Sequence, residues 1–175
     1  MSEEFLGVDE MRARGYDSLS LETGKVVSIA RREAGLLIAA IHEAFRNIPR
    51  PQTTLHVARG LDDEWHLSDE RFRELRAMDP EEDWTELLPD RMDGFTEYFT
   101  FSDDEGWRFY LPAFMCRYLE QFPGRAGHNE IYWACVSKDH VALLNEEQMA
   151  CVERFVTLCH RYEKADGGIR MPPED

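Results

Sequence analysis

The chain has 175 residues, of which 43% are hydrophobic, and its formal net charge is -15 at pH 7. This length and apolar content are enough for one buried core, which excludes an intrinsically disordered protein. Because 35 acidic residues outnumber 20 basic ones, the chain repels nucleic-acid phosphates, which excludes DNA and RNA as partners and favours a basic protein surface.

The N-terminal residues 1–24 combine acids, glycines and few apolar residues without a clear period, so we expect a loosely ordered arm. The first ten residues carry acids where a secretory signal carries basic residues before an apolar core. The longest strongly apolar run, residues 36–41, is far shorter than the roughly 20 residues that a membrane-spanning helix needs. We therefore expect a cytoplasmic protein without a membrane partner.

A first amphipathic helix is predicted from residue 25 onward, because apolar residues recur there at steps of three and four. These residues are Ala30, Ala34, Leu37, Ile38, Ile41, Phe45 and Ile48. Pro49 and Pro51 then end the helix. Residues 53–58 alternate apolar and polar side chains and include β-branched ones, so they predict a brief strand.

Polar residues that can cap a helix mark the next elements. Ser68 is expected to cap a second helix, and Asp79 a third one that begins with proline and two acids. Ser102 and Glu105 have the spacing of a capping box, in which each side chain bonds the other residue's backbone amide. The large apolar residues that follow this box are Trp107, Tyr110, Leu111, Phe114, Tyr118, Leu119 and Phe122. Pro112 is expected either to kink this helix or to separate two helices.

The last helix has the clearest limits, with Asn145 as its cap, Gln148 at the box position and Gly167 beyond its end. Its predicted buried stripe consists of Met149, Val152, Phe155, Val156, Cys159 and Tyr162. Residues 131–136, before this helix, are compatible with a second short strand. Residues 167–175, after it, are expected to form a frayed tail.

These elements predict a mainly α or α+β fold, with about five or six helices and at most one or two short strands. Residues 25–166 are expected to form one compact domain, because no repeat, linker or low-complexity segment divides them. The four cysteines include no CxxC pair and are expected to be buried thiols.

Sequence motifs for nucleophiles, phosphate-binding loops and dinucleotide sites are absent, so no catalytic residue and no cofactor is predicted. Asp62, Asp63 and Glu64, together with His56 and His66, can supply metal ligands or an acid-base pair. A small-ligand or metal-binding enzyme with a site at residues 56–66 is therefore an alternative hypothesis. A solvated acidic loop explains the same residues without chemistry.

The main functional hypothesis is a non-enzymatic protein-interaction domain that binds a basic protein partner. Residues 62–105 contain 17 acids and 4 basic residues, more acids than helix capping requires. A basic surface can dock on this stretch, for which the predicted binding residues are Asp62, Asp63, Glu64, Trp65 and Trp84. The two tryptophans are the expected anchors at a polar rim, and an immunity-type or antitoxin-like inhibitor is one such protein.

Two segments, residues 97–115 and residues 144–148, carry a resemblance to a known family. In the first, a polar cap and an aromatic residue precede the pattern R-x-Y-L-P-A, and the second contains a leucine, a helix cap and a glutamine. The chain resembles, over residues 31–162, an uncharacterised bacterial cytosolic domain family of unknown function. The resemblance implies a bacterial cytosolic origin and assigns no catalytic residue.

Overall fold

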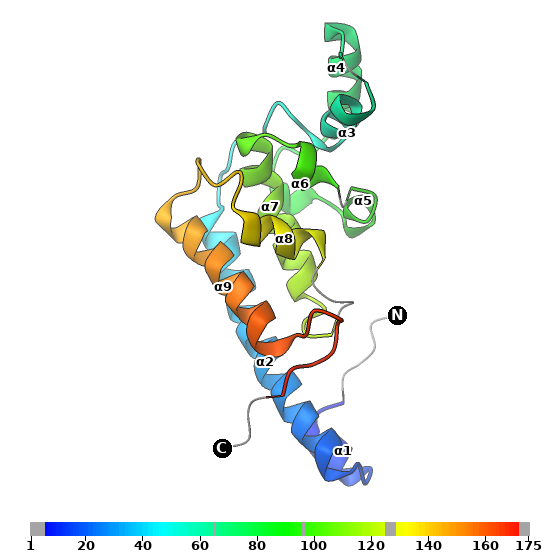
Figure 1. Ribbon diagram of the computed structural model, residues 1–175, viewed down its shortest axis with the longest axis vertical. Coiled ribbons are helices and arrows are strands. Elements are labelled where there is room, and N and C mark those ends of the chain that lie inside the picture. Colours follow the sequence, from blue (N-terminus) through cyan, green and yellow to red (C-terminus); the bar gives the residue numbers. More distant parts are fainter. Residues whose placement is uncertain (1–5, 65, 96, 125–128, 172–175) are drawn as a thin grey trace.

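The structure is a computed structural model that describes residues 6–64, 66–95, 97–124 and 129–171 (Figure 1). Its regular elements in this part of the chain are nine α-helices and one 3-10 helix, η1. In chain order they are α1 Val8–Ala13, α2 Ser18–Ala44, α3 Leu55–Asp63, α4 Asp69–Ala77, η1 Trp84–Glu86, α5 Pro89–Met92, α6 Tyr98–Phe101, α7 Asp104–Leu119, α8 Glu130–Ser137 and α9 Glu146–Tyr162. The mainly α prediction is confirmed, with more and shorter helices than expected.

The long helix α2 sets the shape of the molecule, which is elongated in Figure 1. Helices α7 and α9 pack against α2, and α8 packs against both of them. The paired helices α3 and α4 project from one end of the long axis, and α1 lies at the other end with the first turns of α2 (Figure 1). The two ends are therefore the thin parts of the protein, and the core lies between α2, α7 and α9.

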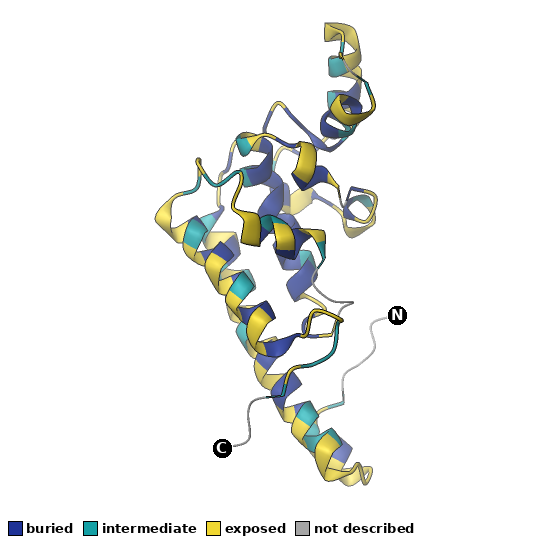
Figure 2. Ribbon diagram, in the orientation of Figure 1, coloured by how far each residue is buried: buried dark blue, intermediate teal, exposed yellow. Residues whose placement is uncertain are grey.

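Helix α7 forms the centre of the core, because every residue from 109 to 116 is buried. The dark segments in Figure 2 show that α2 and α9 turn their buried faces toward this helix, whereas their outer faces are exposed. The predicted core residues are confirmed: Trp107, Tyr110, Leu111, Phe114, Phe155 and Cys159 belong to one cluster. Edge-on aromatic contacts join it, such as Phe99 with Phe114 at 5.0 Å between ring centroids.

The capping prediction for α9 is confirmed, since Asn145 and Gln148 each bond the other's backbone amide, at 2.9 and 3.1 Å. The cap predicted for α7 is wrong by one residue. Asp103 caps α7 by accepting from the Gly106 amide at 2.8 Å, because Ser102 already ends α6 by donating its amide to Tyr98. Pro112 lies within α7, which continues through it as one helix.

The two predicted short strands are wrong, because residues 55–63 and 130–137 are the helices α3 and α8. In α3, Leu55, Val57 and Ala58 are all buried. In a strand, Leu55 and Val57 would share one face and Ala58 would point to the opposite face. In α8, the Asn129 side chain caps the first turn by accepting from the Tyr132 amide at 3.4 Å. Burial against neighbouring helices therefore overrides the β propensity of these short runs.

The helix predicted to start at residue 25 starts at Ser18, where the Asp17 side chain accepts from the Ser20 amide at 2.9 Å. The described residues 8–24 of the expected loose arm are thus largely helical. No helix begins at Asp79 either. Its carboxylate accepts instead from the backbone amide of His56 in the first turn of α3, at 2.8 Å. Asp79 therefore caps a different helix from the one predicted.

The chain after α9 is hydrogen-bonded as far as the structure describes it. Arg170 donates its amide to the Tyr162 carbonyl at 2.8 Å, and Glu163 forms an isolated antiparallel bridge with Ile169. The frayed tail predicted from residue 167 therefore does not begin there, and its last four residues lie outside the described part of the chain.

All four cysteines are buried and unpaired, as predicted. Burial raises the pKa of the Cys116 thiol to about 12, so at neutral pH it is a protonated core side chain. Within residues 6–64, 66–95, 97–124 and 129–171, no helix combines the length and the apolar content that crossing a bilayer requires.

Candidate functional site

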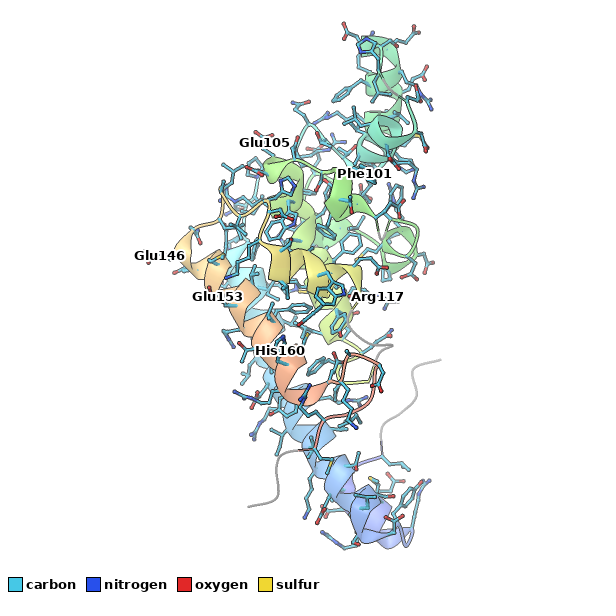
Figure 3. All side chains as sticks on the ribbon, in the orientation of Figure 1. Phe101, Glu105, Arg117, Glu146, Glu153 and His160 are labelled. Atoms are coloured by element: carbon cyan, nitrogen blue, oxygen red, sulfur yellow. The ribbon has the colours of Figure 1, made fainter. Side chains whose placement is uncertain are left out.

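Three of the predicted binding residues lie on the α3–α4 hairpin, which we define as residues 55–77. Asp62 and Asp63 are exposed in the last turn of α3, and Glu64 forms an ion pair with Arg71 of α4 at 2.9 Å. The start of α3 packs against α6, whereas α4 and the end of α3 lie beyond the helical body in Figure 3. The structure thus brings the predicted acids together on a projecting element.

The position of Asp62 and Asp63 on α3 is electrostatically unfavourable. The C-terminal end of a helix carries a partial negative charge from its unpaired carbonyls, and acids in the last turn are repelled by it. Neither the Asp62 nor the Asp63 carboxylate makes a hydrogen bond or an ion pair with any residue that the structure describes. Folding of this chain therefore gains nothing from these two charges.

The hairpin itself is closely packed. An added Cβ at Gly60 would lie 2.4 Å from Cδ1 of Leu75, so a larger residue at this position would have to displace the Leu75 side chain of α4. Leu61, beside Gly60, is 47% exposed and lies directly before the two free aspartates. The end of α3 thus presents one apolar side chain and two carboxylates to solvent.

Of the two tryptophans that were predicted as anchors, Trp84 does not join this surface. Trp84 is only 3% exposed, and its indole nitrogen donates to the Phe45 carbonyl at 2.8 Å inside the core. It is a structural residue, and its predicted role as a surface anchor is wrong. Trp65 lies outside the described residues.

His56 and His66, the two histidines of the alternative site, lie in different environments. His66 is exposed, whereas Nδ1 of His56 lies 2.7 Å from Oδ1 of the buried Asp79. His56 is in the first turn of α3 and Asp62 is in the last, so about 9 Å of helix separates them. Among the described residues, no group of three or more His, Cys, Asp or Glu side chains can hold a metal ion.

A buried polar cluster, which the sequence did not reveal, ties the hairpin to the body. We call Asp79, Glu81, Arg91, Arg50 and His56 the polar junction. The Asp79 side chain is fully buried, and it pairs with Arg91, which also pairs with Glu81 at 2.8 Å. Since one guanidinium stands between two buried carboxylates, it offsets part of the free energy that their desolvation costs.

Arg50 extends the polar junction to the end of α4. Its guanidinium donates to the Arg76 carbonyl at 3.1 Å, to the Asp79 carbonyl and to the Glu82 carboxylate. These bonds fix the end of α4 and the segment that follows it, because Arg76 lies in the last turn of α4 and Asp79 and Glu82 come after the helix. Several acids of the stretch 62–105 therefore stabilise the fold through ion pairs and hydrogen bonds, whereas Asp62 and Asp63 do not. The charge count alone could not separate the two groups.

Glu163 is a second buried acid outside the hairpin. It accepts from the Tyr118 hydroxyl and from the Gly124 amide, the latter at 3.0 Å, and it is fully buried. Burial raises the pKa of this carboxyl above its ordinary value, although the two donated bonds oppose the rise. The folded state therefore favours the protonated acid more than the unfolded state does.

Replacing Glu163 with Gln is expected to leave stability at pH 7 unchanged or to raise it. A raised pKa stabilises the folded state below the unfolded pKa, and this contribution is lost as pH rises through the folded pKa. The glutamine variant stays neutral and does not lose stability in this way, so the difference in unfolding free energy between variant and wild type should shrink as pH falls toward about 4. Urea unfolding at several pH values measures it. A variant that is much less stable at pH 7 than at pH 4, relative to wild type, would contradict the pKa direction.

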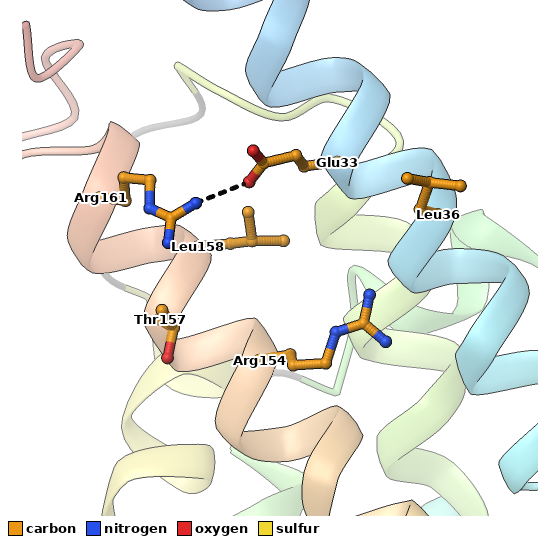
Figure 4. Close-up of a pocket in the computed structure, with 6 residues that line it drawn as sticks. All are labelled: Glu33, Leu36, Arg154, Thr157, Leu158 and Arg161. Carbon is orange, nitrogen blue, oxygen red and sulfur yellow. Dashed lines mark hydrogen bonds and ion pairs between the residues drawn. The ribbon is translucent and has the colours of Figure 1, made fainter. Parts of the chain in front are cut away.

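A surface groove lies between α2 and α9 (Figure 4). It is lined by Glu33, Leu36, Arg154, Thr157, Leu158 and Arg161. Arg161 and Glu33 form an ion pair across it at 3.1 Å, and Leu36 is 63% exposed although it is apolar. The Arg154 guanidinium makes no hydrogen bond or ion pair with the parts of the chain that the structure describes. We refer to this feature as the α2–α9 groove.

Among the comparisons with known proteins, a family model matches this chain. No curated protein and no solved structure matches the chain. The model of a family of unknown function, DUF6714, matches residues 33–168, which contain the α3–α4 hairpin, the polar junction and the α2–α9 groove. This match covers most of the chain, and it starts inside α2, beyond α1. The chain therefore belongs to the DUF6714 family.

Proposed function

We propose that the protein is a non-enzymatic interaction domain that binds a basic protein partner through its α3–α4 hairpin. The observation that carries this proposal is the placement of Asp62 and Asp63, which are exposed, unpaired among the described residues and located at the unfavourable end of a helix. A structural role does not account for them. A cationic partner surface would turn both charges from a repulsive into an attractive contribution.

The shape of the hairpin supports the same proposal. It projects from one end of the molecule (Figure 1), so a partner can approach it without meeting the helical body. Leu61 adds an apolar contact beside the two carboxylates. An inhibitor of the immunity or antitoxin type, made by a bacterium and acting in its cytoplasm on a basic protein, is the class of protein that fits these features.

The enzyme alternative gains no specific support from the geometry. Nδ1 of His56 is engaged by the buried Asp79, and the two histidines do not converge with Asp62 and Asp63 on one point. His56 instead packs edge-on against Phe95 at 4.8 Å between ring centroids and helps to fix α3 on the body. We therefore propose a structural role for His56.

The double change Asp62→Asn and Asp63→Asn is expected to slow association with the basic partner by about tenfold at low salt. The partner is first captured from a host lysate at low salt and identified, and stopped-flow kinetics then follow both proteins at two salt concentrations. The variant should also show a weaker salt dependence, whereas dissociation should change less. Its melting temperature should stay equal or rise slightly, because the repulsion at the end of α3 is removed.

The matched control is the double change Glu146→Gln and Glu147→Gln, which alters the net charge equally in the first turn of α9, on the helical body (Figure 3 labels Glu146). This control should associate at the wild-type rate and melt at a slightly lower temperature, because acids stabilise a helix N-terminus. If both double variants slow association equally, net charge and not the hairpin directs binding, and the proposed site is wrong.

A further inference from the structure

The α2–α9 groove has a local charge opposite to that of the end of α3. Of its six lining residues, Arg154 and Arg161 are basic and Glu33 is acidic, so the groove carries a formal charge of +1. The two helices as a whole are not basic, since α2 and α9 together hold six acids and five Lys or Arg residues. The positive charge that a partner can meet is therefore that of the groove, opposite in sign to Asp62 and Asp63 at the end of α3.

The α2–α9 groove combines a cation with an apolar wall. Arg154 extends its guanidinium toward α2 in Figure 4 and has no partner among the described residues, whereas Leu36 stands exposed on the facing helix. The apolar side chain of Leu158 lies between the two helices. The Glu33–Arg161 pair shows that a carboxylate already binds a guanidinium of α9 here. Arg154 lies about two helical turns before Arg161 on α9, and its unpaired guanidinium offers the same contact to an incoming carboxylate.

The end of α3 has the complementary features. Leu61 is a half-exposed apolar side chain, and the next two residues are the unpaired Asp62 and Asp63. A leucine beside a carboxylate matches a groove that presents Leu36 beside Arg154. Both surfaces belong to the same chain, but the hairpin projects from one end of the molecule and the groove runs along its body, so one copy cannot join them (Figure 1).

We propose that the α2–α9 groove binds the α3–α4 hairpin of a second copy of this chain. Leu61 of one copy packs against Leu36 and Leu158 of the other, and Asp62 or Asp63 pairs with Arg154. This inference rests on the proposed function, because it assigns to the same hairpin one locally basic binding surface, the groove of another copy. The two contact surfaces differ, so the contact is heterologous, and a pair of copies leaves one hairpin and one groove free for further copies.

The net charge of -15 on each copy opposes this contact at long range. Salt near physiological strength shortens the reach of that repulsion to about 8 Å, which leaves pairs in direct contact much less affected. Self-association is therefore expected to be strongest at intermediate salt. It should weaken at low salt, where the repulsion between copies extends further, and at high salt, where the Arg154 pair is screened.

Sedimentation velocity of the full chain tests the proposal at about 0.15 M salt, with protein from about 1 μM to about 1 mM, the range in which weak contacts become occupied. Wild type is expected to show a sedimentation coefficient that rises with concentration. The change Leu36→Asp should weaken this association by about tenfold or more. Its control is Leu19→Asp, since Leu19 is 66% exposed on the same helix but does not line the groove. The control should behave like wild type apart from its added charge.

Mixing two non-associating variants then identifies the surfaces. The Leu36→Asp protein keeps its hairpin, and a protein with Asp62→Lys and Asp63→Lys keeps its groove. Each alone should be monomeric, and the mixture should form a one-to-one complex that cannot grow further. A monomeric wild type over the whole concentration range, or a Leu36→Asp protein that associates like Leu19→Asp, would overturn the inference. Slower binding of the Asp62→Asn, Asp63→Asn protein to a foreign basic partner would still support the proposed function in that case.

Discussion

Replacing Arg91 with Met is expected to lower the free energy of unfolding by about 3 kcal/mol. The change leaves Asp79 and Glu81, which are 0% and 4% exposed, without the guanidinium that pairs with both. Removing one partner of a buried ion pair is far more destabilising than the net contribution of the pair, because the remaining charge stays desolvated. His56 still contacts Asp79, which keeps the loss near the lower end of the usual range.

Urea unfolding of wild type and the Arg91→Met variant measures this loss. The matched control is Arg12→Met, because Arg12 pairs with Asp9 on the surface at 3.0 Å and its loss should change stability by less than about 0.5 kcal/mol. Adding Glu81→Met to Arg91→Met should recover part of the stability, since it removes one uncompensated charge. A loss below about 1 kcal/mol in the single variant would show that the polar junction is hydrated.

Replacing Phe155 with Ala is expected to lower the free energy of unfolding by about 3 to 5 kcal/mol. Phe155 is fully buried on α9, and its ring meets Tyr118 of α7 edge-on at 5.3 Å between centroids. The truncation loses the burial of the ring and leaves a cavity between two helices that cannot close without moving the core. Phe101→Ala is the control, because Phe101 is 39% exposed at the end of α6 (Figure 3).

Thermal or chemical unfolding compares the two phenylalanine variants. Phe101→Ala should change the unfolding free energy much less, since most of the burial of a partly exposed ring is already absent. If Phe155→Ala costs under about 1 kcal/mol, or as little as Phe101→Ala, the stripe on α9 does not form the core that the structure shows.

The sequence by itself determined the features that depend on neighbours in the chain. The cap of α9 follows from Asn145 and Gln148, which are three residues apart and bond each other across the first turn. The core stripes of α2 and α9 follow from apolar residues at steps of three and four, whereas α7 is apolar and buried on all sides. The burial of the four cysteines also follows from their residue type and spacing.

The acidic stretch could be located from the sequence, but its division into structural and free charges could not. Asp79 lies 23 residues from His56, and its bond to the His56 amide forms only when the segment after α4 meets the start of α3. Asp62 and Asp63 differ from Asp79 only in what surrounds them. A charge count treats all three alike, because it has no information on burial or partners.

The tertiary structure alone decided the short elements and the groove. Residues 53–58 and 131–136 are too short for their periodicity to separate strand from helix, and packing against α4, α6 and α9 made them helical. Trp84, which the sequence analysis placed at the surface, is buried in the core, where its indole N–H donates to the backbone carbonyl of Phe45, far away in the chain. The α2–α9 groove joins residues 33 and 161, whose proximity depends on how two helices pack and on no pattern within either one.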